Sequence, residues 1–419
     1  VSDDDSNDQR SETHSPAMTI LRTLIVLLVL AATAACATST QLYRPGPSTL
    51  GAEPVTDFDR YLESVKAYVD TNLVPVDGFE REQQVLWNLP YRLAPAAGCS
   101  SGDRAGILLV HGLSDSPFVF RDLARYLADQ CVEVRTLLLQ GHGTRPGDMV
   151  TASADVWRDQ VRNHFIALSQ DVDRAFIGGF SLGGALATDY ALSETGPRPA
   201  GLIAVAPAWQ LNGLRDYLWL APIADVFADF VEKEPELNPV KYESFSFNAG
   251  SQIGDVISAA QGRIVQQESS DMPLFLAATE ADSVINLDYL ITQFRERFTN
   301  PGNAMVIFRD TRTPWPNAQA DERIRFLNSY LPEFSHQSLL IAPNNELYGL
   351  GAPLQRCLEP NNISLEGCRQ LPEEDLWFSA WHDTERPVYT SRLTYNPWFD
   401  DLAEAVGTFI QANESGEAP

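Results

Sequence analysis

Short apolar runs alternate with amphipathic stretches between residues 105 and 310. The amphipathic stretches have helical spacing, as in "FVFRDLARYLAD" and "ADVWRDQVRNHFIALSQ". The apolar runs, in chain order, are "GILLV" (106–110), "VEVRTLLL" (132–139), "RAFIGGF" (174–180), "AGLIAVAPA" (200–208), "PLFLAAT" (273–279) and "NAMVIFRD" (303–310). Strands that alternate with helices in this way are typical of a parallel sheet that is covered on both faces. We therefore predict an α/β fold with a mostly parallel central sheet and helices on both faces.

This alternation pauses at about residues 208–270, where the chain carries aromatic, helix-like pieces. We predict that this segment is a cap inserted over the ligand-binding edge of the sheet. Two interpretations of its aromatic residues stay open, because their spacing suits an acyl pocket and also suits packing within the cap. These residues are Trp209, Tyr217, Trp219, Phe227 and Phe230. A second addition, at about residues 344–397, is expected to flank the active-site mouth before a closing helix.

The stretch "IGGFSLGGAL" (177–186) places Ser181 between an apolar run and a helix-like stretch. In a nucleophile elbow the turn is so tight that the residues two before and two after the serine must lack bulk. Gly179 and Gly183 occupy those two positions. The alternative is a strand-to-helix turn in which the glycines serve packing alone. The context of a strand before the serine and a helix after it favours a nucleophile.

A serine hydroxyl needs a base, and the base needs an orienting acid. His336 in "EFSHQSLLIAP" follows the last predicted core strand and is the first candidate base, with His382 as the second. Asp282 follows the run "PLFLAAT" and is the first candidate acid, ahead of Glu280 and Asp288. Side chains at the carboxyl ends of parallel strands meet at one edge of the sheet. The sequence therefore predicts a Ser, Asp, His order along the chain.

With these motifs in place, residues 105–343 resemble the monoglyceride lipase and serine aminopeptidase branch of the α/β-hydrolases. The matching motifs are "LLVHGLSDSP", "GHG", "GFSLGG", "TEADSVI" and "FSHQSLL", in that order. The resemblance implies an oxyanion hole formed by the backbone N–H groups of Leu113 and Leu182. The loop "HGLSDSP" departs from the sequence that monoglyceride lipases tend to have there, so the substrate of that family does not carry over.

The same resemblance implies a catalytic triad of Ser181, Asp282 and His336 that hydrolyses carboxylic esters through an acyl-enzyme intermediate. It implies no cofactor, and the sequence offers no His or Cys cluster for a metal. The expected substrate is a small acyl ester or a lipid, and the apolar cap favours acyl chains of short to medium length. Two alternatives remain: an amide or thioester hydrolase with the same machinery, and a non-catalytic envelope lipoprotein.

The N-terminal part of the chain predicts export and a lipid anchor. Arg22 precedes an apolar run at residues 24–30, and small residues lead to Cys36, which is typical of a bacterial signal peptide. The stretch "ATAACA" resembles the lipobox of bacterial lipoproteins, although Thr33 replaces the usual leucine. We expect a leader and signal peptide (1–35), a lipid-anchored tether (36–55) and a hydrolase domain (56–419). The expected location is the cell envelope, at the outer membrane, rather than plain secretion or an uncleaved anchor.

The remaining cysteines predict disulfides, and the net charge argues against one class of partner. Cys99 and Cys131 precede two runs that are expected to be neighbouring strands, whereas Cys357 and Cys368 lie in one loop. We prefer the disulfides Cys99–Cys131 and Cys357–Cys368, with four buried thiols as the alternative. The net charge of −26 repels phosphate backbones and argues against a nucleic-acid partner.

Overall fold

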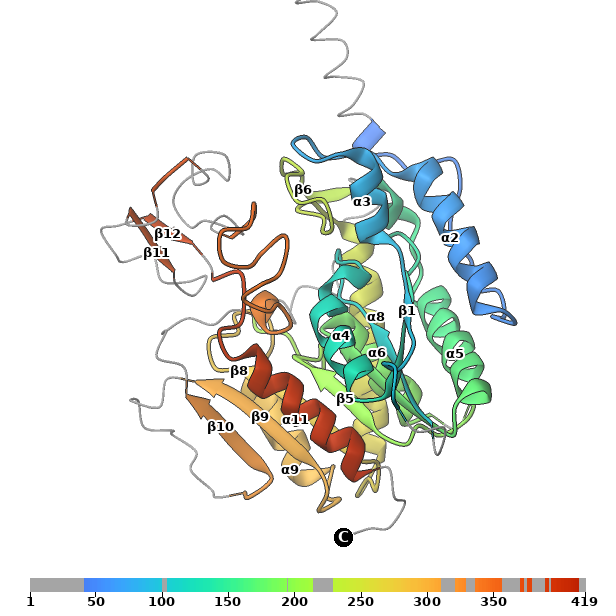
Figure 1. Ribbon diagram of the computed structural model, residues 1–419, viewed down its shortest axis with the longest axis vertical. Helices are drawn as coiled ribbons and strands as arrows, with labels where there is room; N and C mark the ends of the chain where they lie inside the picture. Colours follow the sequence, from blue (N-terminus) through green and yellow to red (C-terminus); the bar gives the residue numbers. More distant parts are fainter. Residues whose placement is uncertain are drawn as a thin grey trace, which may run out of the picture.

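The computed structural model contains one large sheet, with strand order β1-β3-β2-β4-β5-β8-β9-β10 (Figure 1). Only β1 is antiparallel, to its neighbour β3, which confirms the predicted mostly parallel sheet. The strands are β1 (Arg92–Leu93), β2 (Ala105–Val110), β3 (Val132–Thr136), β4 (Arg174–Phe180), β5 (Leu202–Val205), β8 (Leu274–Thr279), β9 (Ala304–Arg309) and β10 (Ile324–Asn328). The structure describes residues 41–99, 104–193, 195–213, 229–309, 321–328, 336–355, 370–372, 375–378, 389–391 and 393–413.

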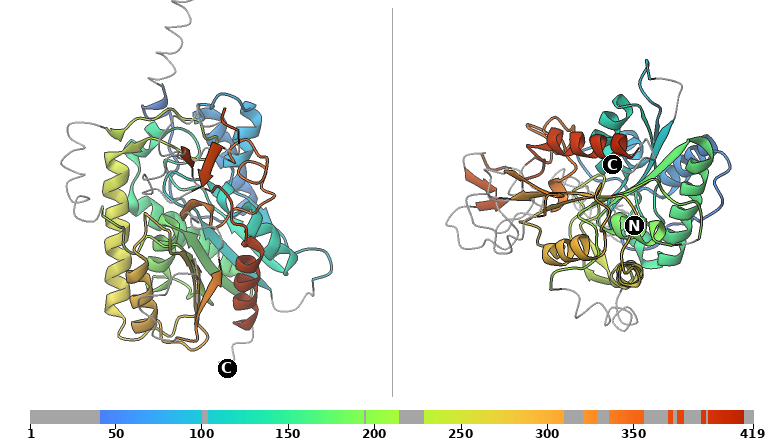
Figure 2. Two further views of the ribbon diagram at one scale, coloured as in Figure 1. Left: turned by 90° about the vertical axis from the view of Figure 1, so that its left-hand side faces the viewer. Right: turned by 90° about the horizontal axis from the view of Figure 1, so that it is seen from below.

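Helices cover both faces of this sheet, as predicted, and the view from below in Figure 2 separates the two layers. One layer contains α5 (Ala154–Asp171), α6 (Leu182–Ala191), α8 (Phe247–Gln266) and α9 (Leu287–Glu296). The other contains α4 (Arg121–Asp129) and α11 (Phe399–Ala412). The central strands β2, β5 and β8 are buried along their whole length. Their continuous apolar runs are therefore explained by contact with helices on both sides.

Shorter elements complete the described part of the chain. Two helices before the sheet are α2 (Phe58–Asn72) and α3 (Arg81–Asn88). The 3-10 turns are η1 (Pro117–Phe120), η2 (Pro146–Thr151) and η4 (His336–Ser338). Two small two-stranded pairs are β6 (Phe230–Glu232) with β7 (Phe245–Ser246), and β11 (Leu376–Phe378) with β12 (Tyr389–Ser391). The predicted closing helix is α11, which packs against α4 and β8.

The described part of the predicted cap contains β6, β7 and α8. Helix α8 packs along α6 and α5, so it belongs to the helical layer on that face of the sheet. The cap boundaries remain a prediction. Residues 214–228 lie outside the described part. Trp209 is buried, donates to Thr188 Oγ1 at 2.8 Å and stacks on Phe298. Phe230 packs edge-on against Tyr43. These two aromatic side chains therefore fit the packing interpretation; Tyr217, Trp219 and Phe227 lie outside the described residues.

Residues 41–55, which we call the strap, lie along the domain. Gln160 Nε2 donates to Gly51 O at 3.1 Å, and Asn163 Nδ2 donates to Ala52 O at 2.6 Å. The sequence predicts that these residues belong to a lipid-anchored tether over residues 36–55. The side chains of α5 bind the backbone of its described part, a long-range arrangement that composition does not encode.

A disulfide joins Cys99 to Cys131, with the Cα atoms 5.5 Å apart. It links the segment before β2 to the start of β3, which are neighbouring strands. The second preferred pair, Cys357–Cys368, and the lipidation candidate Cys36 lie outside the described residues.

Candidate active site

Ser181 occupies the turn between β4 and α6. Its backbone has a φ of 52° and a ψ of −115°, a strained conformation for a residue other than glycine. The Ser181 N–H donates to Val205 O at 3.1 Å, and Ser181 O accepts from Ala208 N at 2.9 Å. These bonds to the end of β5 hold the serine at the carboxyl edge of the sheet.

Glycines on either side make this turn sterically possible. A Cβ atom at Gly179 would lie 2.2 Å from the backbone of Gly183, and one at Gly183 would lie 1.9 Å from Val110 O. Neither position can hold a side chain without moving the backbone. Gly184 serves packing, because a Cβ there would lie 2.8 Å from Pro207 Cβ, just after β5. The glycines of the motif are thus divided between the turn itself and the packing of α6.

His336 and Asp282 meet at the same edge. Nδ1 of His336 lies 2.7 Å from Oδ2 of Asp282, and both side chains are buried. The other carboxylate oxygen of Asp282 accepts the N–H groups of Val284 and Ile285, each at 2.8 Å. The carboxylate is therefore fixed from two sides. Because Nδ1 faces this carboxylate, Nε2 is the ring nitrogen that remains to exchange a proton.

The imidazole ring of His336 also packs against the elbow. Its centroid lies 4.8 Å from that of Phe180, the residue immediately before Ser181 in the chain. The structure therefore places His336, in η4, in contact with Asp282 after β8 and with the residue that precedes Ser181 at the end of β4.

The competing candidates are placed differently. Glu280 forms an ion pair with Arg309, with 3.2 Å between Oε2 and Nε. Asp288 lies in the first turn of α9. His382 is outside the described residues. Among the three candidate acids, Asp282 is thus the one in contact with the histidine ring.

The loop after β2 packs directly against the start of α6. A Cβ atom at Gly183 would lie 2.5 Å from His111 O, and one at Gly112 would lie 3.1 Å from the ring of Phe180. Leu182 is the first residue of α6, and Leu113 follows Gly112. The two backbone segments that were predicted to form an oxyanion hole are therefore neighbours across the elbow.

Comparisons with known proteins identify the class of enzyme. The family model described as serine aminopeptidase, S33, matches residues 102–296. A thermostable monoacylglycerol lipase from Bacillus sp. (strain H-257) is 25% identical over 228 residues, which is 54% of this chain and 82% of that protein. The chain has the α/β-hydrolase fold and is a serine hydrolase of the lipase and esterase type.

Two solved structures similar to this hydrolase are more distant. The Paleococcus ferrophilus monoacylglycerol lipase is 14% identical, with a TM-score of 0.46, over 77% of this chain and 98% of that one. A monoglyceride lipase from Saccharomyces cerevisiae is also 14% identical, with a TM-score of 0.43, over 52% of this chain and 81% of that one.

Two buried histidines of the hydrolase belong to its framework. His111 Nε2 accepts the N–H of Leu139 at 3.1 Å, so its Nδ1 carries the proton and donates to Gly112 O at 2.9 Å. Burial lowers the pKa of His111 well below its ordinary value, and the neighbouring His142 adds to this effect. Burial likewise lowers the pKa of His142 to about 4. Both rings are therefore neutral near pH 7.

A pocket opens beside His336, with about 340 Å³ of empty space including its open mouth. Its polar lining includes Asp115, Lys241 and Gln337, the residue after the histidine. Burial raises the pKa of Asp115 to about 7, although the charges of Lys241 and His336 act in the opposite direction. The pocket thus contains an acidic group and an ammonium group, and the acidic group interacts electrostatically with His336.

Among the residues that the structure describes, no group of three or more His, Cys, Asp or Glu side chains is placed to hold a metal ion. In the same part of the chain, no helix combines the length and the apolar character that a membrane crossing requires.

Sequence reasoning missed the charged residues of the pocket in this hydrolase. Asp115 stands within the motif "HGLSDSP", in which the sequence predicted a role only for the backbone of Leu113. Lys241 lies in the predicted cap, where no local pattern distinguishes it from other polar residues.

Proposed function

We propose that this hydrolase cleaves carboxylic esters, with Ser181 as nucleophile, His336 as general base and Asp282 as the orienting acid. The Ser181 hydroxyl attacks the ester carbonyl while His336 Nε2 takes its proton. The tetrahedral adduct collapses to an acyl-enzyme, and the same proton goes to the departing alkoxide. Water then attacks the acyl-enzyme by the reverse route, and the carboxylic acid leaves. Asp282 holds the ring and stabilises the imidazolium.

The observation that carries this proposal is the 2.7 Å contact between His336 and Asp282 beside the strained Ser181 turn. A buried imidazole that receives a proton needs an adjacent negative charge, which this carboxylate supplies. The assignment of the oxyanion hole to the N–H groups of Leu113 and Leu182 is part of the same proposal. It is supported by the contact between the two segments across the elbow.

Esters are favoured over peptides with a free amino end by the pocket beside His336. A peptidase that binds a substrate ammonium group gains from an uncompensated negative charge near the leaving group or the acyl group. Here the carboxylate of Asp115 shares its pocket with the ammonium group of Lys241. An amine would therefore gain little net attraction from Asp115. Amide or thioester hydrolysis remains the second candidate, because the triad chemistry is the same.

Monoacylglycerol-like esters of short or medium acyl chains are the substrates that we propose to test first. The 25% identity to a monoacylglycerol lipase over 228 residues supports this choice. The experiment measures kcat/KM for one acyl chain presented as an ester, a thioester and an amide, and then for esters from C2 to C16. We expect the ester to exceed the matched amide by more than about 10²-fold. An amide that is cleaved as fast as the ester contradicts the proposal.

We also propose that the enzyme is a bacterial envelope lipoprotein, anchored through Cys36 and active on a small acyl ester or a lipid. The motif "ATAACA" after an apolar run supports this part. The test is metabolic labelling with a clickable fatty acid, in the wild type and in Cys36→Ala. Labelling of both proteins, or of neither, contradicts the anchor and leaves the hydrolase proposal unaffected.

A further inference from the structure

The oxyanion loop, residues 111–116, contains one residue with a left-handed backbone. Ser114 has a φ of 60°, which is unfavourable for a residue that carries a side chain. Such a conformation persists only where the surroundings hold it. Ser114 follows Leu113, whose N–H group is proposed to bind the oxyanion. Whatever holds Ser114 therefore also controls where that N–H group points.

Tyr242, from the predicted cap, holds Ser114. Its backbone N–H donates to Ser114 O at 2.8 Å. Its side chain is buried, and its hydroxyl accepts the N–H of Thr144 at 2.8 Å and donates to Gly141 O at 3.1 Å. Tyr242 therefore spans two loops: its backbone reaches the oxyanion loop, and its hydroxyl fastens it to the loop 141–144.

A second set of contacts connects the same tyrosine to the other side of Leu113. The Tyr242 ring lies parallel to His142, with the centroids 6.4 Å apart, and the His142 ring meets His111 edge-on at 4.8 Å. His111 Nδ1 then donates to Gly112 O at 2.9 Å. Gly112 O and the Leu113 N–H belong to one planar peptide group. Fixing that carbonyl therefore fixes the direction of the proposed oxyanion donor.

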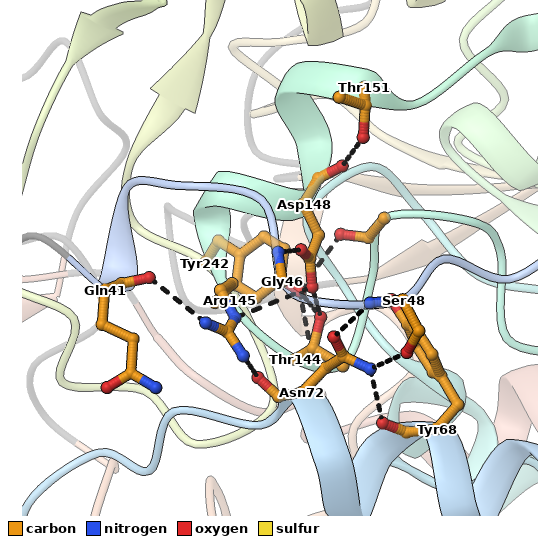
Figure 3. Close-up of polar contacts among 11 residues, drawn as sticks. Gln41, Gly46, Ser48, Tyr68, Asn72, Thr144, Arg145, Asp148, Thr151 and Tyr242 are labelled. Carbon is orange, nitrogen blue, oxygen red and sulfur yellow. Dashed lines mark hydrogen bonds and ion pairs between the residues drawn. The ribbon is translucent and has the colours of Figure 1, made fainter.

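The loop that receives the Tyr242 hydroxyl is itself fastened to the strap, as Figure 3 shows. Thr144 Oγ1 donates to Asp148, and the other oxygen of Asp148 accepts Gly46 N at 2.6 Å. Arg145 donates to Asn72 O and, at 3.4 Å, to Gln41 O. The anchoring point of Tyr242 is thus part of a buried polar network rather than a mobile surface loop.

We propose that Tyr242 is a positioning residue for the oxyanion hole. Its hydroxyl anchors it to the loop 141–144, its backbone N–H holds the Ser114 carbonyl, and its ring supports the Gly112–Leu113 peptide through the two histidines. This inference rests on the proposed ester hydrolysis. Tyr242 touches no reacting atom, so its loss affects the transition state, in which the oxyanion develops, more than substrate binding.

The test is Tyr242→Phe, which keeps the ring and the backbone N–H and removes the hydrogen bonds of the hydroxyl to Thr144 and Gly141. Complete loss of an oxyanion donor costs about 10²–10³-fold in kcat, so we expect a smaller loss, about tenfold, for a loosened loop, with KM within about twofold. The inhibition constant of a trifluoromethyl ketone, which forms a tetrahedral adduct on the serine, is expected to rise by a similar factor.

Tyr190→Phe is the matched control. Tyr190 is also buried, and its hydroxyl donates to Pro197 O at 3.0 Å, remote from the oxyanion loop. This control is expected to keep both kcat and ketone inhibition within about twofold of the wild type. If Tyr242→Phe behaves like Tyr190→Phe in both measurements, the inference is wrong.

Ser114→Gly provides a second variant that does not endanger folding, because glycine adopts a positive φ without strain. We expect kcat to fall about threefold to fivefold with an unchanged or higher melting temperature. In the double variant, Tyr242→Phe is expected to lower kcat little below that of Ser114→Gly, because the oxyanion loop is already loosened. A double loss equal to the product of the single losses contradicts the link between the two residues. A wild type without esterase activity overturns the proposed function. An active wild type together with a Tyr242→Phe variant that has unchanged kcat and ketone inhibition overturns this inference alone.

Discussion

His336 Nδ1 lies 2.7 Å from Asp282 Oδ2 across 54 positions of sequence, and the pair is buried at the carboxyl edge of the sheet. The bond sets the tautomer of the ring and leaves Nε2 directed away from the acid. Asp282→Asn keeps the shape of the pair but removes its charge. By analogy with triads in general, we expect kcat/KM for an ester to fall by about 10³–10⁴ with the fold intact.

Glu280→Gln is the control for that substitution. Glu280 lies two residues earlier and forms an ion pair with Arg309, away from the histidine. We expect its kcat/KM to stay within about threefold of the wild type. Equal losses in the two variants would mean that Asp282 is not the acid of the site.

The packing at the elbow gives a prediction on stability. Gly183→Ala places a Cβ atom 1.9 Å from Val110 O, a backbone atom that cannot move alone. We expect a loss of more than about 3 kcal/mol of unfolding free energy, or no soluble protein. Gly262→Ala in α8 is the control, since no described atom outside the helix's own backbone lies within 4 Å of its Cβ position. A helical alanine there is expected to stabilise the protein by about 0.5–1 kcal/mol, and urea unfolding measures both effects.

His164 makes the fold sensitive to acid. Burial lowers the pKa of His164 to about 3, and the charge of Arg135 contributes, whereas an unfolded histidine titrates near pH 6.5. Below pH 6.5 the histidine of the unfolded state therefore binds a proton, whereas that of the folded state stays neutral. The free energy of unfolding falls as the pH falls toward 3. Within the described part of the chain, Nδ1 of His164 has no hydrogen-bond partner, and the ring packs on Tyr61 and Phe58.

His164→Phe removes this titration and keeps an aromatic ring. We expect the difference in unfolding free energy, variant minus wild type, to be about 2 kcal/mol larger at pH 5 than at pH 7.5. Urea unfolding at the two pH values measures this difference. A difference that does not change with pH would show that His164 is protonated in the folded protein as readily as in the unfolded chain.

The Cys99–Cys131 disulfide closes a loop with a sequence separation of 32. Restricting the unfolded chain in this way stabilises the fold by about 3–4 kcal/mol. The double variant Cys99→Ser, Cys131→Ser is expected to lose that amount in urea unfolding, and to retain kcat because the bond lies away from the elbow. Reductant should lower the stability of the wild type and leave the variant unchanged. If reductant affects both proteins alike, this bond is not the one that stabilises the fold.

The candidate active site could be predicted from the sequence where its signals are local. The Ser181 turn is indicated by glycines two residues before and two residues after the serine, and Asp282 follows an apolar run that is typical of a buried strand. The strands β1 and β10 were not predicted. β1 has only two residues, and β10, "IRFLN", mixes charged and apolar side chains at the edge of the sheet. Short edge strands take their form from a neighbour rather than from their own pattern.

The contacts that support the site could not be read in the same way. Tyr242 reaches residues about 100 positions earlier in the chain, and the strap binds α5 through single side chains. Such bonds depend on where the folded chain brings two segments, and no spacing rule along the sequence encodes them. The packing of Trp209 against Phe298 is of the same kind.

The measurement that tests the central claim most directly is labelling with a fluorophosphonate probe, in the wild type and in Ser181→Ala, together with ester hydrolysis by both proteins. We expect the wild type to be labelled at one site, identified as Ser181 by mass spectrometry, and to hydrolyse a short acyl ester. Ser181→Ala is expected to lose the label and to fall to the background rate. Equal labelling of both proteins, or hydrolysis that survives in Ser181→Ala, would contradict the account.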